Sequence, residues 1–268
     1  MNNRTESGAS SGRAAMQGRP WLALAVWAAI TLWGGRLQAG AAHASLQALV
    51  TQNLLWGVAL AAAFMAVVAW RSGWWQLLGF QAPRPTRALW LLWLPGLYVM
   101  AMFGLSLAQG LPAAPVLLLV LANTLMVGFS EELAFRGVAW GAVRRVLPFW
   151  AGFFLVGLLF GSVHVFNGLI TGEWADATNQ ALNAFMSGAL FLALRIRLRS
   201  IVPVMVLHGL WDCALFLIGT LAAAEAGPTP LGKQVAGGLA LVGPLLVYAL
   251  LLVRSEAVRA GWRDDRMP

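Results

Sequence analysis

Three groups of ionisable residues interrupt otherwise apolar stretches of this chain. They are Glu131, Glu132 and Arg136 in "EELAFR", His164 at the end of "FGSVH", and His208 and Asp212 in "HGLWD". Carboxylates and imidazoles are the side chains that most often transfer protons in catalysis. Placing such a group inside a membrane costs roughly 2.5–3.5 kcal/mol on insertion scales, so it normally faces the protein interior and marks a functional site.

The spacing within each group predicts how its members pair on a helix. Residues four apart share a face, so Glu132 and Arg136 are expected to form an ion pair. Glu131 then points about 100° away and stays free to act. By the same rule His208 lies one turn from Asp212, which can orient the imidazole and stabilise its charged form.

Composition sets the environment that must hold these residues. Of 268 residues, 60% are hydrophobic and 10% charged, and the mean hydropathy is +0.73. This balance excludes a soluble globular domain and predicts one polytopic unit in contact with membrane lipid. The net charge of +8 comes from arginines scattered between apolar runs, so we expect no nucleic-acid partner.

The apolar runs predict an all-α protein with about eight transmembrane helices. Each run is close to the ~20 residues that cross a hydrocarbon core. We expect spans at 20–35, 46–70, 88–109, 114–143, 149–171, 178–197, 200–223 and 235–253. The fourth span is either long or leaves the membrane around Arg144. The first could instead be a signal peptide cleaved near "AHA" at 42–44, but the long polar leader favours an uncleaved span.

The arginines give the domain organisation and topology. Positive residues gather on the even-numbered connections and on both ends of the chain, which predicts that both termini are cytoplasmic. We expect a disordered cytoplasmic tail at 1–19, an integral membrane domain at 20–254 with its motifs within 110–215, and a cytoplasmic tail at 255–268.

Helix depth tests whether the three groups can meet. At a rise of ~1.5 Å per residue, Glu131 lies ~20 Å from the cytoplasmic end of its span and His164 ~22 Å from the end of the next. His208 and Asp212 lie ~12 and ~18 Å along theirs. These depths allow one water-holding cavity, in the cytoplasmic half of the membrane or near its midplane.

The three motifs together resemble the EExxxR, FxxxH and HxxxN/D motifs of the CaaX protease and bacteriocin-processing family, also called CPBP or Abi proteins. Their order, their gaps and their positions on the fourth, fifth and seventh spans all match, over about residues 110–215. The resemblance implies an eight-helix intramembrane endopeptidase of the glutamic type.

By this resemblance, Glu131 activates water and His164 assists it, while His208 with Asp212 supports the oxyanion. Glu132, Arg136 and Phe160 match supporting positions of the motifs. Asp212 stands where the prenyl-protein enzymes have asparagine. An ionised aspartate cannot stabilise an oxyanion directly, so we expect Asp212 either to hold a protonated His208 or to be protonated itself.

Other interpretations of the same residues remain open. The carboxylates and imidazoles could instead bind Zn²⁺, although no HExxH is present and the family mechanism needs no metal cofactor. They could relay protons in a transporter, which would show broken helices in two halves. A non-catalytic scaffold would tolerate Glu131→Gln. Cys213 is predicted to be a small buried residue, because it lies roughly 140° around the helix from His208.

The function predicted from the sequence is therefore endopeptidase cleavage of a peptide or of a segment of a membrane protein. Composition rich in Ala, Gly, Arg and Trp indicates a bacterial inner-membrane protein. Bacteria generally lack protein prenylation, which makes a prenylated substrate doubtful. Processing of C-terminal sorting signals or of bacteriocins, and self-immunity, are the alternatives that the family offers.

Overall fold

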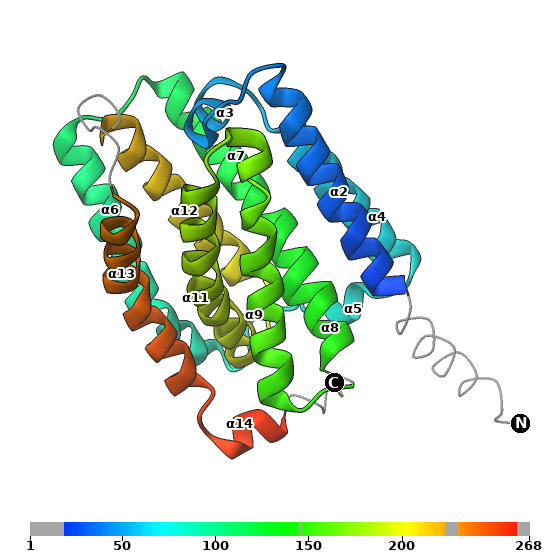
Figure 1. The fold of residues 1–268 in the computed structure, drawn as a ribbon. Helices are drawn as coiled ribbons and strands as arrows, with labels where there is room; N and C mark the ends of the chain where they lie inside the picture. Colours follow the sequence, from blue (N-terminus) through cyan, green and yellow to red (C-terminus); the bar gives the residue numbers. More distant parts are fainter. Residues whose placement is uncertain (1–18, 145, 223–229, 262–268) are drawn as a thin grey trace, which may run out of the picture.

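The computed structural model describes residues 19–144, 146–222 and 230–261, and this part of the chain forms helices and no strand. The long helices run side by side as a bundle (Figure 1). In chain order the helical segments are α2 (Arg19–Ala39), α3 (Leu46–Gln52), α4 (Trp56–Arg71), α5 (Trp75–Leu78), the 3₁₀ segment η1 (Thr86–Leu92), α6 (Trp93–Gln109), α7 (Ala114–Glu132), the π-helical segment η2 (Leu133–Ala139), α8 (Trp140–Val143), α9 (Phe149–Val165), α10 (Gly168–Thr171), α11 (Trp174–Leu198), α12 (Val202–Ala222), α13 (Leu231–Leu252) and α14 (Glu256–Ala260).

The number of membrane spans agrees with the sequence prediction. Within the described ranges, seven helices are long and apolar enough to cross a membrane, and the bent pair α3 and α4 makes an eighth if it counts as one span. The predicted all-α polytopic fold is therefore confirmed. The tail predicted at 1–19 lies outside the described residues except for Arg19, which begins α2. The second half of the tail predicted at 255–268 is also outside them, whereas its first half, 255–261, is described and contains α14.

The second span differs from the prediction of one continuous helix over 46–70. The chain leaves the helix after Gln52, and α4 continues at 82° to α3. Asn123 of α7 satisfies the backbone at this break: its Oδ1 accepts from Leu55 N at 3.0 Å, and its Nδ2 donates to Val50 O at 2.9 Å and Asn53 O at 2.8 Å. The carboxamide that stabilises the break is therefore far away in the sequence, so the local pattern did not reveal it.

The surface of the bundle is apolar where a water-soluble protein would be polar. Trp33, Trp70, Trp90 and Met100 are 64%, 71%, 79% and 65% exposed. Glu132 and Arg136 are instead almost completely buried. This inverted distribution is the one expected when lipid is the solvent.

Close helix packing positions the polar interior. The helix pairs in most extensive contact include α11 with α9 and α13, and α7 with α12. Gly128 and Gly209 let α7 approach α12, because a Cβ on Gly128 would lie 2.6 Å from Met205 O and one on Gly209 2.8 Å from the Leu125 Cα. Small residues allow such approaches between membrane helices.

The fourth span is long, which was one of the two alternatives predicted for residues 114–143. α7, η2 and α8 form a continuous helical span over Ala114–Val143. Its middle is π-helical from Leu133, directly after the two glutamates. Such wide turns often occur at functional sites.

Candidate active site

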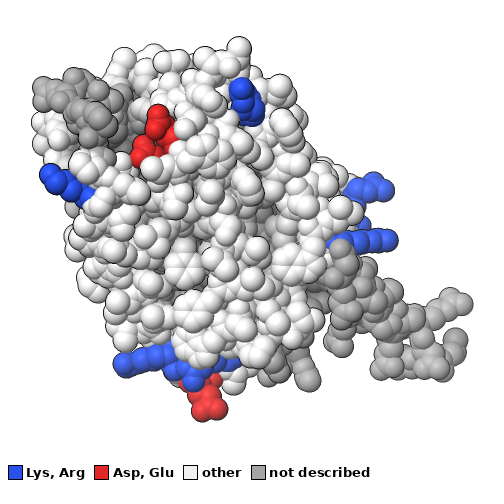
Figure 2. All heavy atoms as spheres, viewed as in Figure 1, with Lys and Arg blue, Asp and Glu red and all other residues white. Residues whose placement is uncertain are grey.

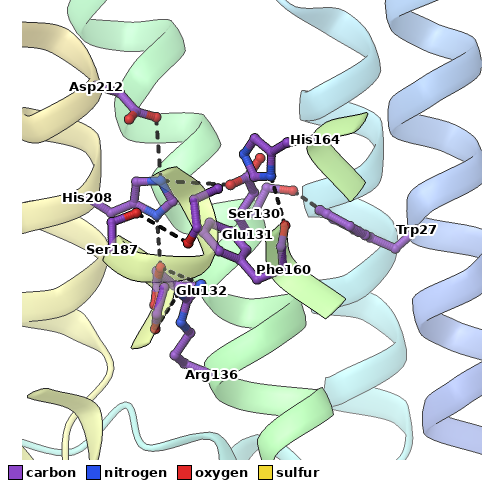
Figure 3. Close-up of polar contacts among 12 residues, drawn as sticks. Trp27, Ser130, Glu131, Glu132, Arg136, Phe160, His164, Ser187, His208 and Asp212 are labelled. Carbon is purple, nitrogen blue, oxygen red and sulfur yellow. Dashed lines mark hydrogen bonds and ion pairs between the residues drawn. The ribbon is translucent and has the colours of Figure 1, made fainter. Parts of the chain in front are cut away.

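Three helices bring the ionisable groups of the three motifs together in the middle of the bundle. Figure 3 shows Glu131 and Glu132 from α7, His164 from α9, and His208 and Asp212 from α12 in one cluster. The sequence predicted that these groups would meet.

Glu132 and Arg136 form the predicted ion pair. Glu132 Oε1 lies 3.0 Å from Arg136 Nη1, and both side chains are fully buried. Arg136 Nη2 also donates to Gly188 O of α11 at 3.0 Å, and its guanidinium lies 4.0 Å from the centre of the Phe160 ring. A Cβ at Gly188 would come within 2.6 Å of Phe160, so this glycine leaves room for the stacked arginine. Glu132 and Arg136 thus bind α7 and η2 to α9 and α11.

His208 lies between three carboxylates. Its Nδ1 is 2.8 Å from Glu132 Oε1, and its Nε2 is 3.4 Å from Asp212 Oδ2 and 3.7 Å from Glu131 Oε2. Carboxylate oxygens face both ring nitrogens, which is the hydrogen-bonding pattern of an imidazolium with two N–H donors. The sequence reasoning assigned the orienting role to Asp212, whereas the shortest contact is with Glu132.

Glu131 has a different environment from its neighbour. Its side chain is 16% exposed, and its Oε2 atom is buried without a hydrogen-bond partner. The preceding residue is fixed in place, because Trp27 Nε1 of α2 donates to Ser130 Oγ at 2.9 Å. Glu131 is therefore held at a defined position while part of its side chain remains accessible to another molecule.

The two ring nitrogens of His164 differ in protonation, which leaves Nε2 able to accept a hydrogen bond. Its Nδ1 is 2.8 Å from Phe160 O, and because a carbonyl only accepts, Nδ1 must carry the proton. A neutral ring then has a lone pair on Nε2. The edge of this ring packs against Phe160, with centroids 4.9 Å apart. Phe160 therefore packs against both Arg136 and His164.

A cavity of about 740 Å³ contains these groups. Its lining includes Glu131, Phe160, His164, His208 and Asp212. The rest of the lining comes mostly from apolar residues of α2, α3 and α4, together with residues of α11 and α13. The cavity provides the space that a water molecule and a substrate both need.

The predicted Zn²⁺ alternative does not fit this arrangement. Among the described residues, no group of three or more His, Cys, Asp or Glu side chains has the geometry to hold a metal ion.

Some residues of the site were not found from the sequence. Phe191 of α11 stacks on His208 with ring centroids 4.8 Å apart, and Gly188 accepts from Arg136. Neither is ionisable, and a search for charges inside spans overlooks both. Cys213 is buried, as predicted, in a separate cluster with Val120 and Leu217.

Comparison with known proteins agrees with the motifs. No curated protein and no solved structure matches the chain. Residues 113–214 match the sequence model of a family described as type II CAAX prenyl endopeptidase, Rce1-like. This segment contains all three motifs, from Glu131 to Asp212. The motif-bearing region of this integral membrane protein is therefore similar to the Rce1-like CAAX protease family, and this similarity supports intramembrane endopeptidase activity at the level of the family.

Proposed function

We propose that this protein hydrolyses a peptide bond with a water molecule activated by Glu131. The observation that carries this proposal is the contrast between the two glutamates. Glu132 is fully buried against Arg136 and His208 and does not line the cavity, whereas Glu131 lines the cavity and its side chain is 16% exposed. A general base must reach both water and substrate, and only Glu131 has that access.

In the proposed reaction, Glu131 accepts a proton from water as the water oxygen bonds to the carbonyl carbon. His164 Nε2 accepts a hydrogen bond from the same water and orients it. The carbonyl oxygen becomes an oxyanion, and His208 Nε2–H stabilises it. Glu131 then returns the proton to the departing amine as the C–N bond breaks. Asp212 and Glu132 keep His208 oriented through these steps.

The substrate is a polypeptide that can enter a membrane-embedded cavity. A peptide or the terminal segment of a membrane protein satisfies this condition, as the sequence predicted. The mostly apolar lining on the α2, α3 and α4 side favours segments with apolar side chains.

The first test uses purified protein in detergent and internally quenched peptides that carry an apolar anchor. Glu131→Gln should lower kcat by about 10²–10⁴-fold, because a glutamine cannot accept the proton from water. Circular dichroism and the thermal unfolding midpoint should remain near those of the wild type. The assay is repeated with a chelator, which should leave activity unchanged.

Two results would contradict this mechanism. Cleavage by Glu131→Gln at the wild-type rate would show that another group activates water. Loss of activity with chelator and its return on adding Zn²⁺ would show metal catalysis. His164→Ala is the matched second variant, and it should also lower kcat while the fold is retained.

A further inference from the structure

A ladder of polar side chains leads along α11 toward the catalytic groups. Asn179, Asn183 and Ser187 follow one another at four-residue intervals, so they share one face of the helix. All three line the cavity that contains Glu131. We call these three residues the α11 ladder.

The carboxamides of the α11 ladder have unused hydrogen-bonding capacity. Asn179 Oδ1 and Asn183 Oδ1 are buried and have no hydrogen-bond partner. Buried polar atoms are normally paired, so these two are candidates for binding another molecule. Asn183 packs against the backbone of Gly238 on α13, where an added Cβ would lie 2.4 Å from Asn183 Oδ1 and 2.7 Å from its Nδ2. The helix packing therefore holds this carboxamide at the cavity wall.

The spacing of the α11 ladder matches an extended polypeptide. Four helical residues rise ~6 Å, and two residues of an extended chain span ~6.6 Å. Successive side chains of the ladder can therefore contact every second residue of a peptide lying alongside α11. A carboxamide both donates and accepts, as a peptide backbone requires, and it does so independently of substrate side chains.

The cavity extends toward one end of the bundle. Lys233, Gly237 and Phe166 are exposed lining residues, and they lie near the end where α11 begins and α9 and α10 meet. Among the described residues, no lining residue is an arginine, and the lining does not continue past Phe191 toward Leu198 at the other end of α11. The described lining therefore runs from the catalytic groups to exposed residues at the Trp174 end, which we call the open end of the cavity.

The arginines lie mainly at the closed end. Within the described residues, the helix ends and connections there carry Arg19, Arg71, Arg84, Arg87, Arg144, Arg195, Arg197, Arg199, Arg254 and Arg259. The open end carries Arg36 and Lys233, together with Glu173 and Asp176. Figure 2 shows Lys and Arg at the lower end of the molecule, where α14 lies in Figure 1, and on its right flank; other basic side chains and an acidic patch lie toward the upper end. Positively charged ends of membrane proteins stay in the cytoplasm.

We propose that the α11 ladder binds the main chain of an extended peptide that enters from the extracytoplasmic side. This proposal rests on the proposed function. The distance from Trp174 to Ser187 is ~20 Å, which an extended chain covers in about six residues. The substrate is therefore an extracytoplasmic terminal segment or loop that reaches about six residues into the membrane. The sequence had allowed a cavity in the cytoplasmic half.

The side of entry is tested in proteoliposomes with two cysteine markers. Glu173 and Glu256 are both exposed glutamates outside the cavity lining, one near each end of the bundle. Glu173→Cys or Glu256→Cys is labelled with a membrane-impermeant maleimide, and wild-type protein provides the background from the buried Cys213. The probe is a water-soluble quenched peptide library added outside the vesicles.

Cleavage of the external peptide should rise in proportion to the fraction labelled at Glu173→Cys. A rate that instead follows Glu256→Cys would overturn the proposed side of entry, while the endopeptidase function would stand. The same preparations are assayed in detergent, where both ends are accessible. Absence of Glu131-dependent cleavage in detergent would contradict the proposed function itself.

The role of the α11 ladder is tested with Asn183→Leu, a substitution of similar size that cannot form hydrogen bonds. We expect KM to rise about three- to tenfold with little change in kcat, because a hydrogen bond to the substrate backbone is lost. Asn183→Gln keeps the carboxamide and should restore part of the affinity. Thr178→Val, on an exposed part of the same helix, is the matched control. An unchanged KM in Asn183→Leu, or the same change in Thr178→Val, would overturn the proposal.

Discussion

Glu131 and Glu132 are neighbours in the sequence, but their partners give them different tasks. Glu132 lies within a buried set of contacts with Arg136 and His208, at 3.0 and 2.8 Å. Glu131 is not within hydrogen-bond distance of Arg136 or His208, and it lines the cavity. The difference follows from the ~100° turn between adjacent residues of a helix. One carboxylate can therefore stabilise the fold while the other remains available to substrate and water.

The first prediction at this scale concerns the buried ion pair. Glu132→Gln leaves Arg136 as a buried charge without its partner, and such a loss typically costs about 3–5 kcal/mol. The double variant Glu132→Gln with Arg136→Met removes both charges and should recover part of that stability. The measurement is unfolding in detergent, with Glu173→Gln as the exposed control. A double variant less stable than Glu132→Gln alone would show that the charge is not the cause.

The second prediction concerns Asp212, which stands where prenyl-protein enzymes of the family have asparagine. Glu132 holds His208 through Nδ1 at 2.8 Å, a shorter contact than the 3.4 Å to Asp212. Asp212→Asn should therefore retain cleavage within about tenfold of the wild type. His208→Gln should lose it, because the donor to the oxyanion is removed. Steady-state kinetics of the two variants on the same peptide test this difference. An equal loss of kcat in Asp212→Asn and His208→Gln would assign Asp212 an essential role.

At the scale of elements, the approach of α7 to α12 decides whether the catalytic groups meet. Gly128 lies one turn before Glu132 on α7, and Gly209 follows His208 on α12. Because neither has a side chain, the two helices pack backbone to backbone. Any side chain at Gly128 must push His208 away from the two glutamates.

We therefore predict that Gly128→Ala lowers both stability and activity. Its Cβ would lie 2.6 Å from Met205 O, and strain of this kind costs about 1–3 kcal/mol. Gly104→Ala on α6 is the matched control, since nothing lies within 4 Å of its added Cβ. Unfolding midpoints and kcat should be unchanged in Gly104→Ala and lower in Gly128→Ala. Equal behaviour of the two variants would contradict the packing argument.

At the scale of the whole molecule, the bent segment α3 and α4 determines the topology. If this pair crosses the membrane once, the chain crosses eight times and both termini lie on the same side. Seven crossings would place them on opposite sides. The arginines at the ends of α2, α4, α8 and α11 favour eight crossings.

We predict that epitope tags on the two termini have the same protease sensitivity in spheroplasts. Both should be protected in intact spheroplasts and digested after permeabilisation, because the arginine-rich end remains cytoplasmic. A periplasmic fusion serves as the digestion control. Protection of only one tag would contradict eight crossings.

The sequence by itself determined the class of fold and singled out the residues of the candidate site. A charged residue in a lipid-facing run has a high cost, so Glu131, Glu132 and Arg136 stood out in their surroundings. The four-residue spacing also predicted the Glu132 and Arg136 pair, because α-helical geometry is local. The length of the apolar runs predicted the spans for the same reason.

Tertiary structure alone decided how distant elements meet. Asn123 stabilises a break about seventy residues away, His208 takes Glu132 as its shortest carboxylate contact, and the α11 ladder lines the same cavity as Glu131. Each depends on the rotation and approach of separate helices, which side-chain volume across an interface sets. The residue pattern of one sequence shows the periodicity within each helix, but it does not show the angle between two helices. The open end of the cavity therefore became visible only when all the helices were packed together.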